Sequence, residues 1–300
     1  MTEPVRFDNR VAIVTGAGGG LGREHALALA ARGAKVVVND FGRTATNGQT
    51  AAEAVVAEIQ ANGGSAVANL ASVTDERAIR AMVADTLERW GRVDILVNNA
   101  GILRDRSFGK MTLEDFRLVV EVNLMGAAIC THAVWEVMRA QKYGRIVMTT
   151  SSSGLYGNFG QSNYGAAKMA LVGLMQTLSI EGAKHGIRVN CLAPTAATQM
   201  TEGLWPESVL EAFRPEYVTP ALLVLAAEDA PNRTILCAGA GTFEAAHVTL
   251  TNGAWIGTGA DAAERLRERL SEVMDRSCAI EPQSGEDQGR NEATKALSRA

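Results

Sequence analysis

A serine, a tyrosine and a lysine stand in one short stretch, SSSGLYGNFGQSNYGAAK, with a spacing that suits proton transfer. Tyr164 and Lys168 are four residues apart, so on a helix they share one face. A free phenol has a pKa of about 10, and a neighbouring ammonium lowers it by favouring the phenolate. Ser151 lies upstream and could donate to a substrate oxygen. The pattern predicts general acid–base chemistry at Tyr164, although an ordinary surface helix can also carry the Tyr–Lys spacing.

A glycine-rich turn, TGAGGGLG, lies near the N-terminus and contains Gly16, Gly20, Leu21 and Gly22. It follows the apolar run VAIVTG and opens the helical pattern LGREHALALAAR. Glycine lets the backbone turn sharply and approach a pyrophosphate, which then faces the unpaired N–H groups of the helix N-terminus. A glycine-rich turn alone is often a plain loop, but between a strand and a helix it predicts dinucleotide binding.

Asp40 ends the next apolar run, AKVVVND. A carboxylate at this place can accept hydrogen bonds from both hydroxyls of the adenosine ribose and repels a 2′-phosphate. The alternative is a turn-forming aspartate before Phe41 and Gly42, and the nearby Arg43 argues for a phosphate. The position of Asp40 in the pattern predicts NAD rather than NADP as cofactor.

Short β-branched runs alternate with longer helical patterns along most of the chain. The runs at 11–16, 34–40, 65–70, 93–101, 144–152 and 187–194 read as buried strands, and 247–253 as a further strand. This alternation predicts an α/β fold, a Rossmann-type doubly wound parallel sheet with helices on both faces. In such sheets ligands bind at the carboxyl ends of the strands, where Ser151 is expected.

The alternating pattern predicts a single NAD-binding domain at residues 1–256, followed by a C-terminal extension at 257–300. The segment at about 198–220 holds Trp, Pro and Phe residues without a clear strand, and we expect it to form a substrate lid. The extension is expected to be helical first and then disordered, because its last residues are polar.

Composition excludes several classes of function. The net charge of −4 provides no basic footprint for nucleic acid. The four cysteines and four histidines share no ligand spacing, which predicts no metal site, no disulfide framework and a reducing compartment. The N-terminus lacks the apolar segment of a signal peptide, and no apolar run approaches the roughly 20 residues of a membrane span. We expect a soluble cytoplasmic protein with a small-molecule substrate.

Together with NNAG (residues 98–101) and the asparagine in EVNLMG, these motifs resemble the short-chain dehydrogenase/reductase family over roughly residues 8–256. The resemblance implies that Tyr164 is the catalytic acid/base and that Lys168 activates it and binds the nicotinamide ribose. It also implies that Ser151 positions the substrate and that Asn123 holds a water of the proton relay.

The resemblance also assigns cofactor contacts to residues at the strand ends. Asn98, Ala100 and Gly101 would line the cofactor site, Val73 would lie against the adenine, and Thr198 near the carboxamide. The chain departs from the family in two places. It has Ser72-Val73 where the family often has Asp-Val, and Pro194-Thr195 where the family often has Pro-Gly.

Further stretches resemble the (3R)-hydroxyacyl-CoA dehydrogenase domain of type 2 peroxisomal multifunctional enzymes and its bacterial relatives: NNAGILRDRSF, RPEYVTP and GAWIG. This resemblance implies a stand-alone enzyme that oxidises a (3R)-3-hydroxyacyl-CoA to the 3-ketoacyl-CoA, with bulky or sterol-derived acyl groups within reach. Arg104, Arg106 and Lys110 are candidates for the CoA phosphates; the alternative is that Arg104 and Arg106 form ion pairs with Asp105 and order the loop.

Three other functions are weighed beside this one: a 3-ketoacyl thioester reductase, a dehydrogenase of a hydroxysteroid or another free secondary alcohol, and a dinucleotide-binding regulator without activity. A regulator is expected to lose Ser151, Tyr164 or Lys168, and this chain keeps all three. The helix faces at 119–124 and 171–178 are more apolar than a monomer needs. In the resembled family these helices build dimers, so the resemblance implies a homodimer or homotetramer.

Overall fold

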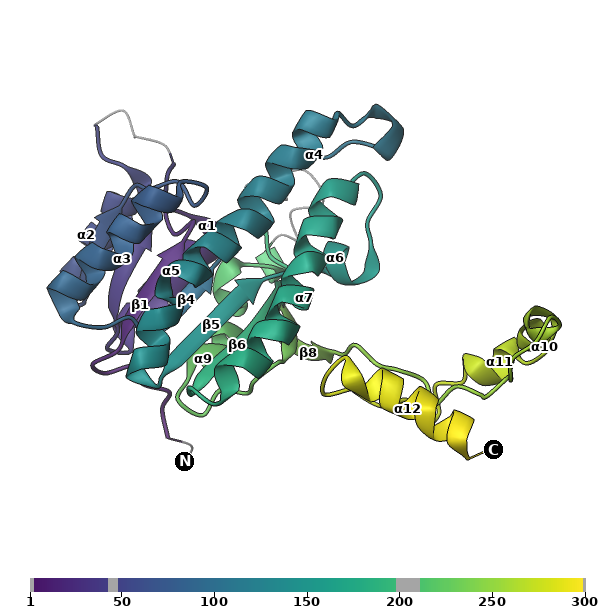
Figure 1. Cartoon of the computed structure of the whole chain (residues 1–300). Coiled ribbons are helices and arrows are strands. Elements are labelled where there is room, and N and C mark those ends of the chain that lie inside the picture. Colours follow the sequence, from purple (N-terminus) through teal and green to yellow (C-terminus); the bar gives the residue numbers. More distant parts are fainter. Residues whose placement is uncertain (1–2, 43–47, 198–210, 299–300) are drawn as a thin grey trace. The chain divides into compact units, whose positions relative to one another are not determined.

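The computed structural model describes residues 3–42, 48–197 and 211–298. By its internal contacts the chain divides into two units, Met1–Ala245 and Ala246–Ala300. The first unit contains a sheet of eight strands in the order β3-β2-β1-β4-β5-β6-β7-β8 (Figure 1). This confirms the predicted Rossmann-type α/β fold. The predicted domain boundary after residue 256 stays a prediction. The division by internal contacts falls earlier in the chain, at the end of β8.

Six strands pair in parallel and coincide with the six apolar runs of the sequence: β1 (Val11–Thr15), β2 (Lys35–Asn39), β3 (Ser65–Asn69), β4 (Ile95–Asn98), β5 (Gly144–Thr149) and β6 (Ile187–Pro194). The seventh, β7 (Ile235–Gly239), pairs in parallel with β6. Every residue of β1, β4 and β5 is buried. Strands covered on both faces read as continuous apolar runs, which is why the sequence predicted them.

The predicted strand at 247–253 is wrong: within it only Leu250 forms an isolated bridge, to Ile280. The additional strands are β7 and β8 (Thr242–Ala246). Ala240 and Gly241 connect them with φ angles of 51° and 74°, which is the type I′ turn of an antiparallel hairpin. Four of the five residues of β8 are exposed, so this edge strand carries little of the apolar pattern on which the prediction relied.

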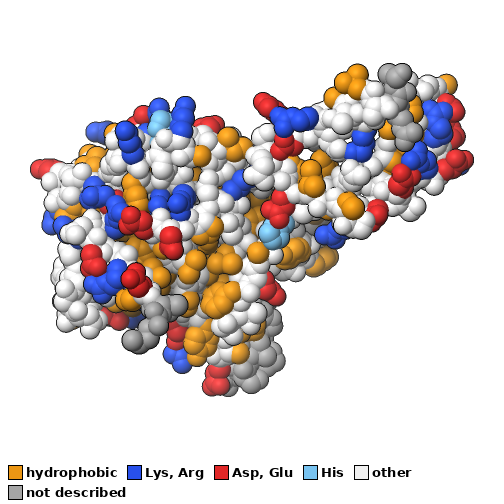
Figure 2. All heavy atoms as spheres, turned by 90° about the horizontal axis from the view of Figure 1, so that it is seen from below, with side chains coloured by type: hydrophobic (Ala, Val, Ile, Leu, Met, Phe, Trp, Pro, Cys, Tyr) orange, Lys and Arg blue, Asp and Glu red, His pale blue; other side chains and the backbone are white. Residues whose placement is uncertain are grey.

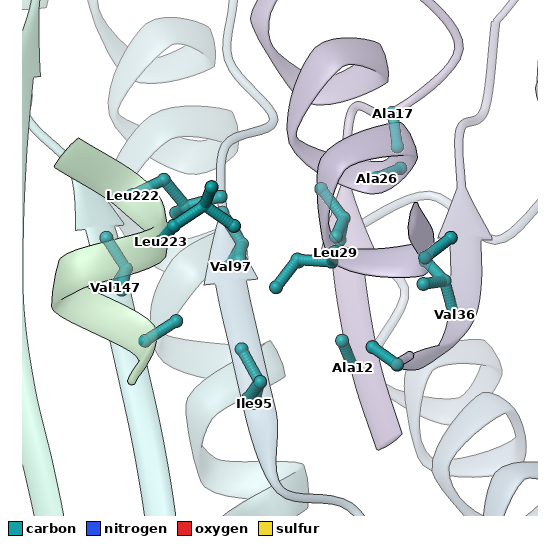
Figure 3. Packing of buried hydrophobic residues seen from close by; sticks show 14 of the residues in the cluster. Ala12, Ala17, Ala26, Leu29, Val36, Ile95, Val97, Val147, Leu222 and Leu223 are labelled. Atoms are coloured by element: carbon teal, nitrogen blue, oxygen red, sulfur yellow. The ribbon is translucent and has the colours of Figure 1, made fainter. Parts of the chain in front are cut away.

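Helices cover both faces of the sheet. On one face lie α1 (Gly20–Ala31), α2 (Ala51–Ala61) and α9 (Thr219–Ala226). On the other lie α3 (Glu76–Trp90), α5 (Gly126–Gln141) and α7 (Ser162–Ala183). In Figure 3, Leu29 of α1 and Leu222 of α9 point onto Val97 and Val147 of the sheet, and all four belong to one buried cluster. This packing fixes the strand ends from which the site is built.

The segment Leu113–Gln141 is one continuous helical stretch formed by α4 (Leu113–Val120), a π turn (Glu121–Met125) and α5. By length and composition alone it could cross a membrane, with a mean hydropathy of 1.5. Its residues Val119, Val134 and Met138 are buried in the protein core. A core helix therefore also accounts for the apolar character of this segment. Shorter helices are η1 (Phe108–Lys110), α6 (Ser152–Tyr156) and η3 (Pro215–Tyr217).

The second unit contains α10 (Ala262–Glu268), α11 (Leu270–Val273) and α12 (Glu286–Leu297). None of its described residues is fully buried. The sequence predicted helix followed by disorder, whereas the structure forms α12 in the polar segment. Acidic residues in the first turn of α12 and Lys295 in its last turn complement the helix dipole, a signal that composition alone does not contain.

The charged side chains show no segregation by sign on the face in Figure 2. Among its described residues, Lys and Arg side chains lie interspersed with Asp and Glu. Such a surface carries no extended basic stripe. On this face, therefore, no strongly basic region accompanies the small net negative charge of the chain.

Candidate active site

The order of the strands reverses at β1, which lies between β2 and β4. At this switch point Asn99 ties the two strand ends together, because its Nδ2 donates to the carbonyls of Thr15 and Gly16, both at 3.0 Å. The hydroxyl of Thr15 in turn accepts from the backbone N–H groups of Asn99 and Ala100. Sequence reasoning assigned Asn98 and missed Asn99, although both stand in the same NNAG motif.

The glycine turn after β1 has the geometry of an anion cradle. Gly16 has a φ of 62°, which favours glycine, and a Cβ at Gly22 would overlap the carbonyl oxygen of Gly16. Helix α1 begins after Gly19 without a side-chain cap and without an acidic residue in its first turn. Its first N–H groups therefore remain available, and with the helix dipole they fit a pyrophosphate.

Asp40 lies beside this turn at the end of β2. Its Oδ2 accepts from the Gly18 N–H at 2.8 Å and its Oδ1 from the Gly42 N–H at 2.6 Å. The turn-forming role weighed from the sequence is thus present. It leaves further lone pairs on both oxygens for ribose hydroxyls. Arg43, which argued for a phosphate, lies outside the described residues.

A pocket of about 210 Å³ opens at the carboxyl ends of β4, β5 and β6. It brings together several of the predicted site residues, which come from six separate parts of the chain. Those that line it are Leu21, Gly101, Asn123, Ser151, Tyr164, Lys168 and Pro194. Gly16, Gly20, Gly22, Asp40 and Ala100 belong to the adjacent glycine turn and strand ends.

Ser151 and Tyr164 line the same pocket, and the serine side chain lies close enough to the phenol to lower its pKa. Ser151 caps α6, and its Oγ accepts from the Ser153 N–H at 3.1 Å. Lys168 lies on the same face of α7 as Tyr164, with its Nζ 5.5 Å from the centroid of the tyrosine ring. The Nζ donates to the Thr149 carbonyl at 2.7 Å. The predicted catalytic group of hydroxyl, phenol and ammonium is therefore assembled in one pocket.

Burial dominates the titration of this group. It raises the pKa of Tyr164; the Ser151 side chain opposes the rise, and the charge of Asp105 adds to it. Burial also lowers the pKa of Lys168 to about 8, against a smaller opposite effect of Cys191. Sequence reasoning expected a lowered pKa for Tyr164 because it considered only the neighbouring ammonium. Desolvation of the phenolate, which depends on tertiary packing, outweighs that effect.

Asn123 lies in the π turn between α4 and α5. Its Nδ2 donates to the carbonyls of Ile102 and Val119 at 3.0 and 2.9 Å, whereas its buried Oδ1 has no partner. This oxygen and the Lys168 Nζ both face the space beside Gly101. A buried acceptor opposite a buried ammonium fits an ordered water between them. Such π turns are frequent at functional sites.

Three of the described cofactor candidates, Asn98, Ser72 and Val73, belong neither to the pocket lining nor to the glycine turn. The side chain of Asn98 donates to α5 at 2.9 Å, and the hydroxyl of Ser72 shares a hydrogen bond with Thr74. Val73 packs against the start of α5. Thr198 lies outside the described residues, as does most of the predicted lid. Their cofactor contacts stay predictions.

The pocket also has lining residues that sequence reasoning missed: Asn99, Leu103, Thr149, Ser152, Ser153, Asn158, Gln161, Thr195 and Ala196. Gln161 carried a detectable signal, since it precedes Tyr164 by three residues and stands at the N-cap position of the same helix. Residues at this spacing share a helix face. Most of the others come from loops, where no period marks the inward side, whereas Thr149 ends β5 and Ser152 and Ser153 begin α6.

The loop after β4 carries the three cations considered for CoA. Arg104 lies 3.9 Å from Asp115, while Asp105 accepts from Gln161. Neither arginine therefore pairs with Asp105 as the alternative supposed. Arg106 and Lys110 have exposed side chains. Within the described ranges, no group of three or more His, Cys, Asp or Glu residues is placed to hold a metal ion.

The family model for short chain dehydrogenases matches residues 10–208. The chain is similar to the peroxisomal multifunctional enzyme type 2 of Mus musculus, with 47% identity over 95% of this chain and 39% of that protein. A putative short-chain type dehydrogenase/reductase of Mycobacterium tuberculosis is 50% identical over 79% of this chain and 84% of its own. A 3-oxoacyl-acyl-carrier-protein reductase of Synechocystis sp. is 45% identical over 74% and 90%, respectively.

Two solved structures extend these similarities. The full-length peroxisomal multifunctional enzyme type 2 of Drosophila melanogaster has a TM-score of 0.81 and 39% identity over 98% of this chain and 50% of its own. A 7α-hydroxysteroid dehydrogenase in complex with NADH and a 7-oxo bile acid has a TM-score of 0.71 and 31% identity over 79% and 95%. The chain thus spans about half or less of the length of the multifunctional relatives it matches.

Proposed function

The chain belongs to the short-chain dehydrogenase family, and from that premise we propose that it oxidises the secondary alcohol of a (3R)-3-hydroxyacyl-CoA to the 3-ketoacyl-CoA with NAD. The observation that carries the proposal is the grouping of Ser151, Tyr164 and Lys168 in one pocket at the carboxyl edge of the sheet. The family uses NAD or NADP, and the choice of NAD belongs to the proposal.

Three observations support a nicotinamide dinucleotide, and the second and third of them favour NAD over NADP. The uncapped start of α1 and the glycine turn fit a pyrophosphate, and Asp40 stands where an adenosine ribose would follow. A 2′-phosphate there would meet the carboxylate. The related 7α-hydroxysteroid dehydrogenase was solved with NADH. When bound, the cofactor would accept the hydride from the carbon that bears the hydroxyl.

The chain's own residues would handle the proton. The phenol of Tyr164, in its ionised form, would take the proton of the substrate hydroxyl, while Ser151 donates to the same oxygen. The Lys168 ammonium, with a pKa of about 8, remains mostly protonated at neutral pH. Its positive charge would stabilise the phenolate whose pKa burial otherwise raises. The pocket thus supplies a base, a donor and a counter-charge for one oxygen atom.

Asn123 would continue the proton path. Its orphaned Oδ1 and the Lys168 Nζ face the same space beside Gly101. A water bound to Asn123 there would accept a proton from Lys168, which could then recover one from Tyr164. The π turn would matter because it presents the amide oxygen on the inner side of the helix.

The acyl thioester is favoured over the other substrates by the relatives, whose names include a multifunctional peroxisomal enzyme and a 3-oxoacyl reductase. Because the chain is also similar to a hydroxysteroid dehydrogenase, a free secondary alcohol is the second candidate substrate. Arg106 and Lys110 would offer cations to the CoA phosphates at the edge of the pocket. A regulator without activity is disfavoured because the reacting groups are assembled.

The first test is the initial rate of NADH formation with (3R)- and (3S)-3-hydroxyacyl-CoA, each with NAD and with NADP. Turnover confined to NAD and the 3R isomers is expected. Tyr164→Phe should lower kcat by roughly 100- to 10,000-fold, because it removes the proton acceptor, while NAD affinity stays close to that of the wild type. Tyr143→Phe, at the opposite edge of the sheet, is the matched control. Full activity of Tyr164→Phe would refute the assignment.

We also propose a homodimer or homotetramer in the cytoplasm. Part of the apolar surface expected to form the interface is buried within the protomer, including Val119 and Leu171. Leu118 on α4 and Ile180 on α7 remain 43% and 51% exposed, and these two helices are in contact. Light scattering in solution tests the assembly, and fractionation of the cells tests the location.

A further inference from the structure

A set of hydrogen bonds links the loop after β4 to the start of α7. The Nε2 of Gln161 donates to Asp105 Oδ2 at 2.6 Å. The Oε1 of Gln161 accepts from Ser153 Oγ at 2.7 Å and from Asn158 Nδ2 at 3.1 Å. Gln161 lines the reaction pocket and is only 8% exposed. A buried amide with three partners is a built part of the pocket wall.

The loop itself is fixed against this wall by backbone contacts. The Arg106 N–H donates to the Gly160 carbonyl at 2.9 Å, and Asn163 Nδ2 donates to the Arg104 carbonyl at 3.1 Å. These two bonds flank Asp105 on both sides in the sequence. Its carboxylate is therefore held beside Gln161 even though the residue is exposed.

The partners determine which way the Gln161 amide points. A flipped amide would place its oxygen against the Asp105 carboxylate, so that two acceptors would face each other at hydrogen-bond distance. It would also place its nitrogen against the donating nitrogen of Asn158. Both contacts are repulsive, and the one with a full negative charge is the stronger. Asp105 therefore holds the Gln161 nitrogen in one orientation.

Counting the hydrogen-bonding groups shows what the amide has left to offer. A glutamine amide has two N–H groups and two lone pairs on its oxygen. In Gln161 both lone pairs are used, by Ser153 and Asn158, and one N–H is used by Asp105. The remaining group is the second N–H. The pocket wall at Gln161 is thus a donor, and it calls for an acceptor oxygen on the substrate.

The position of Gln161 relative to Tyr164 indicates which substrate oxygen would accept this N–H. Gln161 and Tyr164 are three residues apart at the start of α7 and line the same pocket. If Tyr164 takes the oxygen on C3 of the substrate, Gln161 is placed for a second oxygen a short distance along the molecule. A 3-hydroxyacyl thioester has such an acceptor, its carbonyl oxygen on C1. A simple secondary alcohol has none.

We propose that Gln161 binds the thioester carbonyl oxygen of the substrate, and that Asp105 is a positioning residue that keeps the Gln161 amide in the donating orientation. The inference rests on the proposed function and names the chemical feature that the site requires: a carbonyl two carbons from the reacting carbinol carbon. It distinguishes 3-hydroxyacyl thioesters from free secondary alcohols at the level of a single hydrogen bond.

The test compares two substrates that differ only at this oxygen. One is a (3R)-3-hydroxyacyl-CoA, and the other is its thioether analogue, in which a CH₂ group replaces the thioester carbonyl. We expect the wild type to show a kcat/KM for the thioester roughly tenfold above that for the thioether, since one hydrogen bond is worth about a factor of ten. Gln161→Met should abolish this preference, because it lowers the kcat/KM for the thioester toward the value for the thioether.

Two variants of Asp105 separate positioning from charge. Asp105→Ala removes the acceptor, frees the amide to rotate and should reduce the preference for the thioester. Asp105→Asn retains a side-chain oxygen that can accept from Gln161, so this variant should show the thioester preference of the wild type. Ser162→Ala, on the neighbouring exposed residue outside the pocket, is the matched control and should behave as the wild type. Circular dichroism and NAD binding verify that each variant is folded.

Two results would overturn the inference while leaving the proposed function in place. One is an equal loss on both substrates in Gln161→Met, which is what a purely structural role predicts. The other is an unchanged preference for the thioester in that variant. A wild type that oxidises a free secondary alcohol and neither CoA compound would instead overturn the proposed function, and the inference with it.

Discussion

Removal of the buried ammonium of Lys168 changes the pH dependence of stability in a direction that the structure determines. Burial lowers the pKa of this lysine from 10.5 to about 8, so between these values the unfolded chain binds more protons than the folded chain. Stability from this group is therefore lowest below pH 8 and rises with pH between about 8 and 10.5. The gain between pH 7 and pH 9 is about 1 kcal/mol for a pKa change of this size.

The variant Lys168→Met has no such group and should lack the gain. The measurement is urea unfolding of the wild type and the variant at pH 7 and pH 9, at one protein concentration. Because other groups titrate in both proteins, the difference between the two pH increments isolates Lys168. Lys184→Met, at the exposed end of α7, is the control and should follow the wild type. Equal increments in wild type and Lys168→Met would refute the desolvation argument.

Three further predictions follow from single contacts. In Gly22→Ala the new Cβ overlaps the Gly16 carbonyl, so NAD affinity measured by titration calorimetry should fall by roughly tenfold. The control is Gly19→Ala, whose Cβ meets no protein atom within 4 Å. It should bind NAD as the wild type does. Burial lowers the pKa of His25 to about 3, so the unfolded chain binds the extra proton below pH 6.5. The wild type should lose about 2 kcal/mol more between pH 7 and pH 5 in urea unfolding than His25→Gln, and equal losses would contradict this. Asp94 is fully buried and forms ion pairs with two arginines. The variant Asp94→Asn should lower the free energy of unfolding by about 3 kcal/mol. Unchanged NAD affinity in the folded variant would show that the effect is confined to the far edge of the sheet.

The parts of the fold that the sequence predicted are those with a local signal. Six strands coincide with apolar runs, and five of these strands are largely buried. The glycine turn and the Tyr164–Lys168 spacing have fixed offsets along the chain. The hairpin of β7 and β8 was missed because most of β8 is exposed, which removes its apolar pattern. The end of the chain was expected to be disordered from its polar composition, yet α12 forms there.

The sequence alone determined which groups can react: a phenol and an ammonium on one helix face, a hydroxyl at a strand end, and a turn that accepts a dinucleotide. Only tertiary structure decided how these groups titrate and what surrounds them. Burial raises the pKa of Tyr164 against the sequence-based expectation, and the π turn leaves the Asn123 oxygen without a partner. The contact between Asp105 and Gln161 joins residues 56 positions apart. Desolvation and long-range hydrogen bonds depend on atoms that no local period brings together, which is why they could not be predicted from the chain.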